Sequence, residues 1–183
     1  MVKLNLPLTW FTPLGIKITQ YYYKSKKTLI PLKFAGKTKK LIIREWTDIM
    51  NKQKQTQAII PNIIHSLDAN HLINIVNFIN KENPKVNVIT IHDCFGTHPN
   101  HMNYLEFVVR KEFILLYSNE NFLEKFHNRF LQTLDDNQIP ITIDDKTLES
   151  LVEINNRCYK IPQLPKLGNL DLQKIKDAKY MIC

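Results

Sequence analysis

Apolar side chains recur at helical spacing over residues 64–79, and a run of mostly β-branched residues, VNVITI, follows at residues 86–91. The helical spacing predicts an amphipathic helix that starts near Pro61 and is closed by the sequence KENP. The β-branched run predicts a short buried strand. A helix followed closely by a buried strand favours an α+β fold. The positions that carry the helical spacing are Ile64, Leu67, His71, Leu72, Ile75, Val76 and Ile79.

The rest of the sequence mixes segments typical of strands with segments typical of helices. Residues 14–45 are rich in β-branched and aromatic side chains with a polar break at residues 24–27, which predicts a lysine-rich β-hairpin or ribbon. The polar residues 46–57 predict a helix. No repeat and no linker divides the sequence, so we expect one domain. Further helices are expected at residues 102–117, 120–134 and 146–159, and a short strand or loop at residues 140–143.

Positive charge is concentrated in the first third of the chain. Residues 1–57 hold twelve Lys or Arg against Glu45 and Asp48, whereas the other 126 residues carry a net charge of −2. A localised basic region favours a polyanion such as nucleic acid, because each neutralised phosphate releases counterions. A two-stranded ribbon also fits the major groove of DNA. An ordinary solvated basic hairpin has the same composition, so both interpretations stay open.

The three cysteines, Cys94, Cys158 and Cys183, form no CxxC pair and are odd in number. This pattern favours a reducing compartment and argues against a disulfide framework or a zinc knuckle. No apolar run approaches the ~20 residues that span a bilayer, so we expect no membrane association. We also see no secretory or transit signal at the start of the sequence.

The predicted strand at residues 86–91 is followed by His92, Asp93 and Cys94. A carboxylate at the end of a buried strand is costly unless it is paired or binds a metal. Aspartate also caps turns, so a purely structural role stays open. On the preceding helix, His65, Asp68 and His71 are spaced to lie close to one face. That row fits metal ligands or phosphate-binding donors, and it also fits ordinary helix-surface polarity.

Two longer strings resemble signature sequences of the single-subunit, phage- and mitochondrial-type DNA-directed RNA polymerases. They are PNIIHSLDANHL at residues 61–72 and TIHDCFGTH at residues 90–98, and the second resembles motif C of the polymerase palm. The strings PLTWFTPLG at residues 7–15 and LGNLDLQKIKDAKYMIC at residues 167–183 are also similar to the family. The form HDCFGTHP is most similar to mitochondrial and linear-plasmid members.

The resemblance implies the C-terminal portion of a right-hand polymerase: a palm strand-turn-strand with surrounding helices, after an N-terminal basic β-hairpin. The resemblance implies one incomplete polymerase region with two zones. Residues 1–57 would form a basic hairpin zone that could contact the promoter, with residues 17–43 as the candidate hairpin. Residues 58–183 would hold palm motif C and the C-terminal helices. The implied activity is template-directed nucleotidyl transfer by a two-metal mechanism using Mg²⁺. The implied partners are a DNA template and promoter, the RNA product and ribonucleoside triphosphates, and the implied location is the mitochondrion, with the gene on a linear plasmid.

By the same resemblance, Asp93 is the catalytic aspartate and a metal ligand, and His92 and His65 lie near the nucleic acid. The terminal residues from Tyr180 onward would form a packed tail. The family's motif A aspartate and motif B helix have no match before residue 60. We therefore expect that these 183 residues alone do not polymerise, and that they are a gene remnant, a fragment or one piece of a split enzyme. In the last two cases, a missing N-terminal polymerase portion would be the partner that supplies the other motifs.

Two alternatives stay open at this point. One is an HD-type metal phosphohydrolase that uses His65, His71 and the His92-Asp93 pair, which in that class lies on a helix. The other is a non-catalytic nucleic-acid-binding remnant, which would bind through residues 1–57 and would not depend on Asp93.

Overall fold

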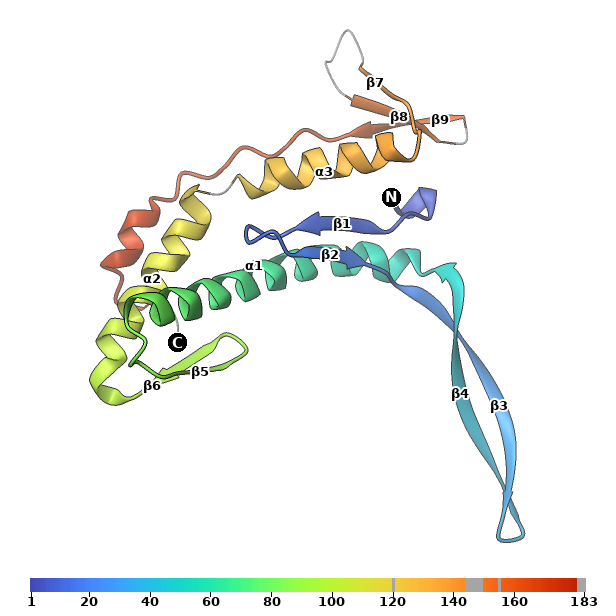
Figure 1. The fold of residues 1–183 in the computed structure, drawn as a ribbon. Helices are drawn as coiled ribbons and strands as arrows, with labels where there is room; N and C mark the ends of the chain where they lie inside the picture. Colours follow the sequence, from blue (N-terminus) through green and yellow to red (C-terminus); the bar gives the residue numbers. More distant parts are fainter. Residues whose placement is uncertain (120, 144–149, 155, 181–183) are drawn as a thin grey trace. The chain divides into compact units, whose positions relative to one another are not determined.

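The computed structural model describes residues 1–119, 121–143, 150–154 and 156–180 (Figure 1). Helices and strands are both present, in agreement with the expected α+β class. The chain forms two compact units, one of residues 1–9 and 19–60 and the other of residues 10–18 and 61–183. Within the described ranges, no helix is long and apolar enough to cross a membrane.

The first unit is dominated by a long antiparallel hairpin of β3 (Tyr23–Phe34) and β4 (Lys37–Met50). Its turn lies at Ala35 and Gly36, which have φ values of 50° and 73°. Two successive residues with positive φ suit a two-residue hairpin loop, because that turn matches the twist of the strands. The turn expected at residues 24–27 is therefore wrong. The helix expected at residues 46–57 is wrong up to Met50, where β4 ends, and confirmed from Lys52, where α1 begins.

We call residues 23–50 the basic ribbon. It carries eight Lys or Arg against two acidic residues, and most of its side chains are exposed. Aromatic side chains lie among these cations, and Phe34 and Trp46 are both 74% exposed. An isolated two-stranded hairpin is marginal in water, so a ribbon of this length gains stability when a partner covers it. The cations are Lys24, Lys26, Lys27, Lys33, Lys37, Lys39, Lys40 and Arg44.

Helix α1 (Lys52–Glu82) follows the ribbon and continues through Pro61. The helix therefore begins about two turns before Pro61, where its start was expected. The expected end of the helix at the KENP sequence is confirmed. The Asn51 side chain accepts a hydrogen bond from the backbone N–H of Lys54 at 3.1 Å, which satisfies one of the free donors of the first turn. This cap sets the true start of the helix.

The core of the second unit lies between the C-terminal half of α1, the hairpin of β5 (Val88–Ile91) and β6 (Cys94–Thr97), and α2 (Met102–Asn119). The expected strand at residues 86–91 and the helix at 102–117 are present as β5 and α2. The expected burial of the strand is wrong, because Ile89 and Ile91 are 69% and 67% exposed. A second strand, β6, lies where only a turn-rich link was expected, and it pairs with β5. The buried core residues are Ile75, Ile79, Val86, Leu105, Val108 and Val109.

A turn near the N-terminus packs against another side of α1. It joins β1 (Leu8–Phe11) to β2 (Lys17–Gln20), which form a two-stranded sheet. Trp10 is fully buried, and its indole Nε1 donates to Ser66 Oγ at 3.1 Å. The backbone N–H of Leu14 donates to Asn70 Oδ1 at 3.0 Å. Because residues 66 and 70 are one helical turn apart, these bonds fix the rotation of α1 about its axis.

The C-terminal part consists of α3 (Phe122–Asp136), a three-stranded sheet of β7 (Ile141–Ile143), β8 (Ser150–Ile154) and β9 (Arg157–Ile161), and the short 3-10 helix η3 (Leu172–Lys176). The helix expected at 120–134 and the strand at 140–143 are confirmed.

The helix expected at residues 146–159 is wrong. Its described residues lie in β8 and β9, which pair in antiparallel register around a turn where Asn156 has a φ of 59°. Asparagine tolerates this left-handed conformation better than most residues, which favours a hairpin here. Residues 144–149 and 155 of that prediction lie outside the described residues. Tyr180 is 73% exposed, so the expected packing of the tail is not present at this residue.

Candidate active site

His92 and Asp93 form the tight turn between β5 and β6. Ile91 pairs directly with Cys94, so only these two residues connect the strands. His92 has a φ of 53°, a left-handed conformation that costs a non-glycine residue roughly 1–2 kcal/mol. Backbone strain of this kind clusters at functional sites. The turn presents both side chains to solvent, and both are exposed.

A cavity of about 510 Å³ joins this turn to α1. His65 and Asp68 line it from one face of the helix, one turn apart, and His92 and Asp93 line it from the hairpin. Ala69 and Leu72 complete the lining. Two carboxylates and two imidazoles, from segments more than twenty residues apart in sequence, therefore share one open cavity.

The Asp93 carboxylate has no hydrogen-bond or ion-pair partner among the residues that the structure describes. A turn-capping role would require its oxygens to accept a backbone N–H, as Asn51 does at the start of α1. The side chain is instead free to receive a cation or a donor from another molecule.

His71 is separate from this cavity, although it lies on the same helix as His65. Its side chain is buried, and Nε2 donates to the Val109 carbonyl at 2.9 Å, with the rings of Phe95 and Phe113 at centroid distances of 6.2 and 5.5 Å. Burial lowers the pKa of His71, and the hydrogen bond and the charge of Asp68 offset only part of that effect. The neutral ring therefore attaches α1 to α2 and is not placed to bind a metal in the cavity.

These positions tell against the HD-type phosphohydrolase. That class needs its His-Asp pair on a helix, whereas residues 88–91 form a strand and the pair lies in the turn after it. It also needs His71 as a ligand, and this imidazole is engaged with Val109.

The donors in the cavity fit Mg²⁺ in kind but not in number. Carboxylate oxygens are the ligands that this ion prefers, and Asp68 and Asp93 supply them. No group of three or more His, Cys, Asp or Glu side chains within the described ranges is arranged to hold one metal ion. An ion here would need further oxygen ligands from outside these residues.

Beside the turn, one face of the β5–β6 hairpin is apolar and uncovered. Ile89 is 69% exposed and Ile91 is 67% exposed, and they share this face with Cys94 and Gly96. A cavity of about 550 Å³ lies over them. An added Cβ at Gly96 would meet only the Ile89 carbonyl oxygen, at 3.9 Å, so another segment has room to approach closely.

Comparison with known proteins gives the chain its family. The sequence matches the family of DNA-dependent RNA polymerases over residues 1–183. The chain belongs to this polymerase family. It is 39% identical over 99% of its length to a probable DNA-directed RNA polymerase of Gelasinospora sp.. It is 31% identical over 95% of its length to the mitochondrial DNA-directed RNA polymerase of Schizosaccharomyces pombe, and 26% identical over 96% to a chloroplastic one of Nicotiana sylvestris.

The chain spans only a small part of these polymerases. It covers 22% of the Gelasinospora protein and 15% of each of the other two. The family match over residues 1–183 confirms, at the level of the family, the resemblance that the sequence strings indicated.

Three residues singled out by the sequence, Asp93, His92 and His65, line one cavity in this polymerase segment. From the sequence, Asp68 stood out only as a member of the row with His65 and His71, although the structure places it in the same cavity. Its spacing of three residues from His65 was the available signal. His71 belongs to the same row, but it is buried against α2 and lies outside the cavity.

Proposed function

We propose that these residues are the C-terminal palm segment of a single-subunit DNA-directed RNA polymerase that carries out template-directed RNA synthesis. The observation that carries the proposal is the cavity in which Asp93 and His92 meet His65 and Asp68. The partners would be a DNA template and promoter, the growing RNA and ribonucleoside triphosphates.

Asp93 is the proposed catalytic carboxylate and ligand of Mg²⁺. Its lack of a partner in the described part of the chain supports this role, because an unengaged carboxylate at a tight turn is available to a cation. When bound, Mg²⁺ would neutralise the phosphates and activate the RNA 3′-hydroxyl, as in two-metal nucleotidyl transfer. Asp68 is close enough to the same cavity to add negative charge beside the ion.

His92 and His65 are proposed to contact the nucleic acid near the reacting end. Imidazole nitrogens donate to phosphate or hydroxyl oxygens. His65 lines the cavity from α1 and His92 lines it from the β5–β6 turn. The attachment of α1 through Ser66 and Asn70 on one side and His71 on another supports this, because it fixes the part of the helix backbone that carries His65.

The rest of the palm is proposed to cover the apolar face of Ile89 and Ile91. Exposed apolar strand faces in a segment that spans about a fifth of its relatives favour burial against the remaining polymerase chain. A segment packed there would lie beside Asp93, where a second metal-binding carboxylate is needed. The basic ribbon is proposed to contact promoter DNA, which its cations and exposed aromatic residues support.

We also propose that the protein acts in the mitochondrion and that its gene lies on a linear plasmid. Similarity to a mitochondrial polymerase supports the first point. The form of the HDCFGTHP string supports the second.

The 183 residues alone are expected to give no RNA synthesis, because one pair of carboxylates without the other palm motifs cannot complete a two-metal site. Primer extension on a defined template measures this directly. A polymerase that contains these residues is the positive control and should extend the primer under the same conditions. Magnesium-dependent extension by the purified 183-residue chain would contradict the proposal.

A further inference from the structure

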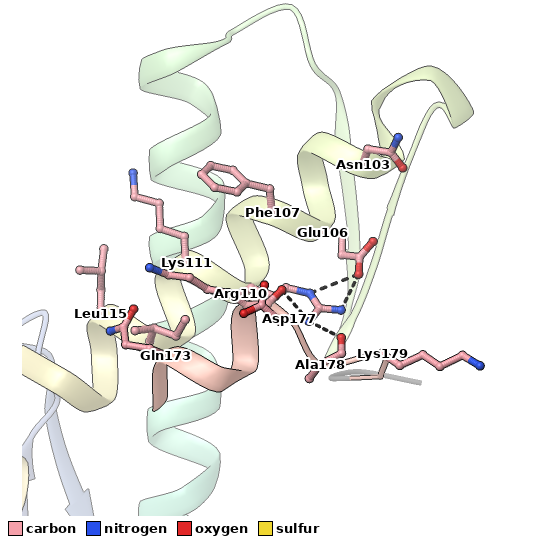
Figure 2. A pocket seen from close by; sticks show the side chains of 12 residues that line it. Asn103, Glu106, Phe107, Arg110, Lys111, Leu115, Gln173, Asp177, Ala178 and Lys179 are labelled. Carbon is pink, nitrogen blue, oxygen red and sulfur yellow. Dashed lines mark hydrogen bonds and ion pairs between the residues drawn. The ribbon is translucent and has the colours of Figure 1, made fainter. Parts of the chain in front are cut away.

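A guanidinium group on α2 holds the residues at the end of η3 (Figure 2). Arg110 Nη1 donates to the carbonyl oxygens of Ile175 at 2.6 Å and Ala178 at 2.7 Å, with a longer contact of 3.5 Å to Lys176. These carbonyls belong to the end of η3 and the residues just after it. The Arg110 side chain is only 11% exposed, so the bonds are largely shielded from water.

Glu106, one turn earlier on α2, holds the other side of the guanidinium. Its Oε1 accepts from Arg110 Nη2 at 2.5 Å and from Nε at 3.2 Å. Arginine is suited to this double task, because its planar group offers five donors in a fixed geometry. The Glu106 carboxylate thus orients the guanidinium so that Nη1 faces the carbonyls of Ile175 and Ala178.

Besides the Arg110 contact, the described part of this segment has one cap, in which Asp171 Oδ1 accepts from the Gln173 N–H at 3.0 Å, and two half-buried apolar side chains, Leu172 and Ile175. Helix η3 has five residues, and short 3-10 turns are weak by themselves. The extended residues before it expose Leu167 to 79% and Leu170 to 74%, so they contribute little apolar burial. The free carbonyls at the end of a helix also carry partial negative charge, which a cation stabilises.

We infer that Arg110 is the positioning residue for residues 171–180, and that these residues detach from α2 when its forked contact is lost. The contact also forms one wall of a cavity of about 710 Å³, which Phe107 and Leu115 line from α2. The adjacent residue, Val109, holds His71 through its carbonyl. The same stretch of α2 thus holds the end of η3 and the helix that carries His65.

The decisive substitution is Arg110→Lys in the full 183-residue chain. Lysine keeps the charge, but its single ammonium cannot bridge two carbonyls and Glu106 together. We expect hydrogen exchange of the amides of residues 172–178 to quicken by about tenfold or more, since several charge-assisted bonds are lost. Tryptic cleavage after Lys174 and Lys176 should rise in parallel. Exchange in the core at Ile75 and Val108 should stay unchanged.

The matched control is Lys111→Gln. Lys111 lines the same cavity on the next position of α2, but its Nζ lies 3.9 Å from the centroid of the Phe78 ring, away from the tail carbonyls. This variant removes a charge and should leave exchange at residues 172–178 as in the unmodified chain.

Unchanged exchange at residues 172–178 in Arg110→Lys would overturn the inference. So would an equal increase in the core, because Arg110 would then support the whole unit and not the tail. The readout involves no RNA synthesis, so the inference stands or fails independently of the proposed function.

Discussion

Replacement of Asp93 by Asn in a polymerase that contains this segment is expected to lower RNA synthesis by roughly a thousandfold, while DNA binding stays unchanged. Asparagine keeps the size of the side chain but removes the charge that we propose holds Mg²⁺. Loss of several kcal/mol of charge stabilisation in the transition state corresponds to about this factor. Single-turnover primer extension measures the rate, and a binding titration with the same template measures affinity.

The turn itself should tolerate this substitution. Asp93 is exposed and makes no contact that holds the hairpin together in the described part of the chain. Asp135→Asn is the matched control, since Asp135 is an exposed aspartate on α3 outside the cavity. It should leave synthesis unaltered. Synthesis at the normal rate by the Asp93→Asn enzyme would remove Asp93 from the catalytic machinery.

Neutralisation of the cations at the tip of the basic ribbon is expected to have the second-largest effect, and on DNA binding. Four Lys→Gln substitutions at positions 33, 37, 39 and 40 should weaken binding by about a hundredfold at low salt. Each lost phosphate contact should also reduce the slope of log K against log salt by about 0.9. Titrations at several salt concentrations measure both quantities. The hairpin should remain, because Ala35 and Gly36 set its turn.

The control replaces four exposed lysines outside the ribbon by Gln, so that the net charge falls by the same amount. If binding depends only on overall charge, the two quadruple variants will behave alike, and the proposal for the ribbon fails. A ribbon variant that also loses catalysis on a preformed primer-template, where no promoter is needed, would likewise contradict it. The control positions are Lys81, Lys85, Lys166 and Lys174.

The strand and turn that carry His92 and Asp93 were more predictable from the sequence than the course of the basic ribbon. The strand before Asp93 could be predicted because its residues are β-branched and its length is too short for a helix. The turn of the basic ribbon was misplaced because polarity usually marks turns. Both faces of the ribbon are exposed, so polar residues such as Lys26 and Lys27 can lie within a strand. The actual turn is formed by the small residues Ala35 and Gly36.

The division of the helical row could not be predicted. His65, Asp68 and His71 have spacings that put them near one face, yet two line the cavity and the third is buried against α2. The rotation of α1 decides this, and Trp10 sets it through Ser66, 56 residues away in the sequence. Contacts between residues so distant in sequence leave no periodic signal.

The most direct test of a metal site at Asp93 is to replace Mg²⁺ with Fe²⁺ in a polymerase that contains this segment and is bound to primer and template. With added hydrogen peroxide and ascorbate, hydroxyl radicals form at the bound iron and cut the polypeptide close to the ion. We predict cuts near residues 91–95 and near residues 65–69, because both segments line the same cavity. Excess Mg²⁺ should suppress these cuts. Cleavage confined to other parts of the polymerase would contradict the assignment of Asp93 as a metal ligand.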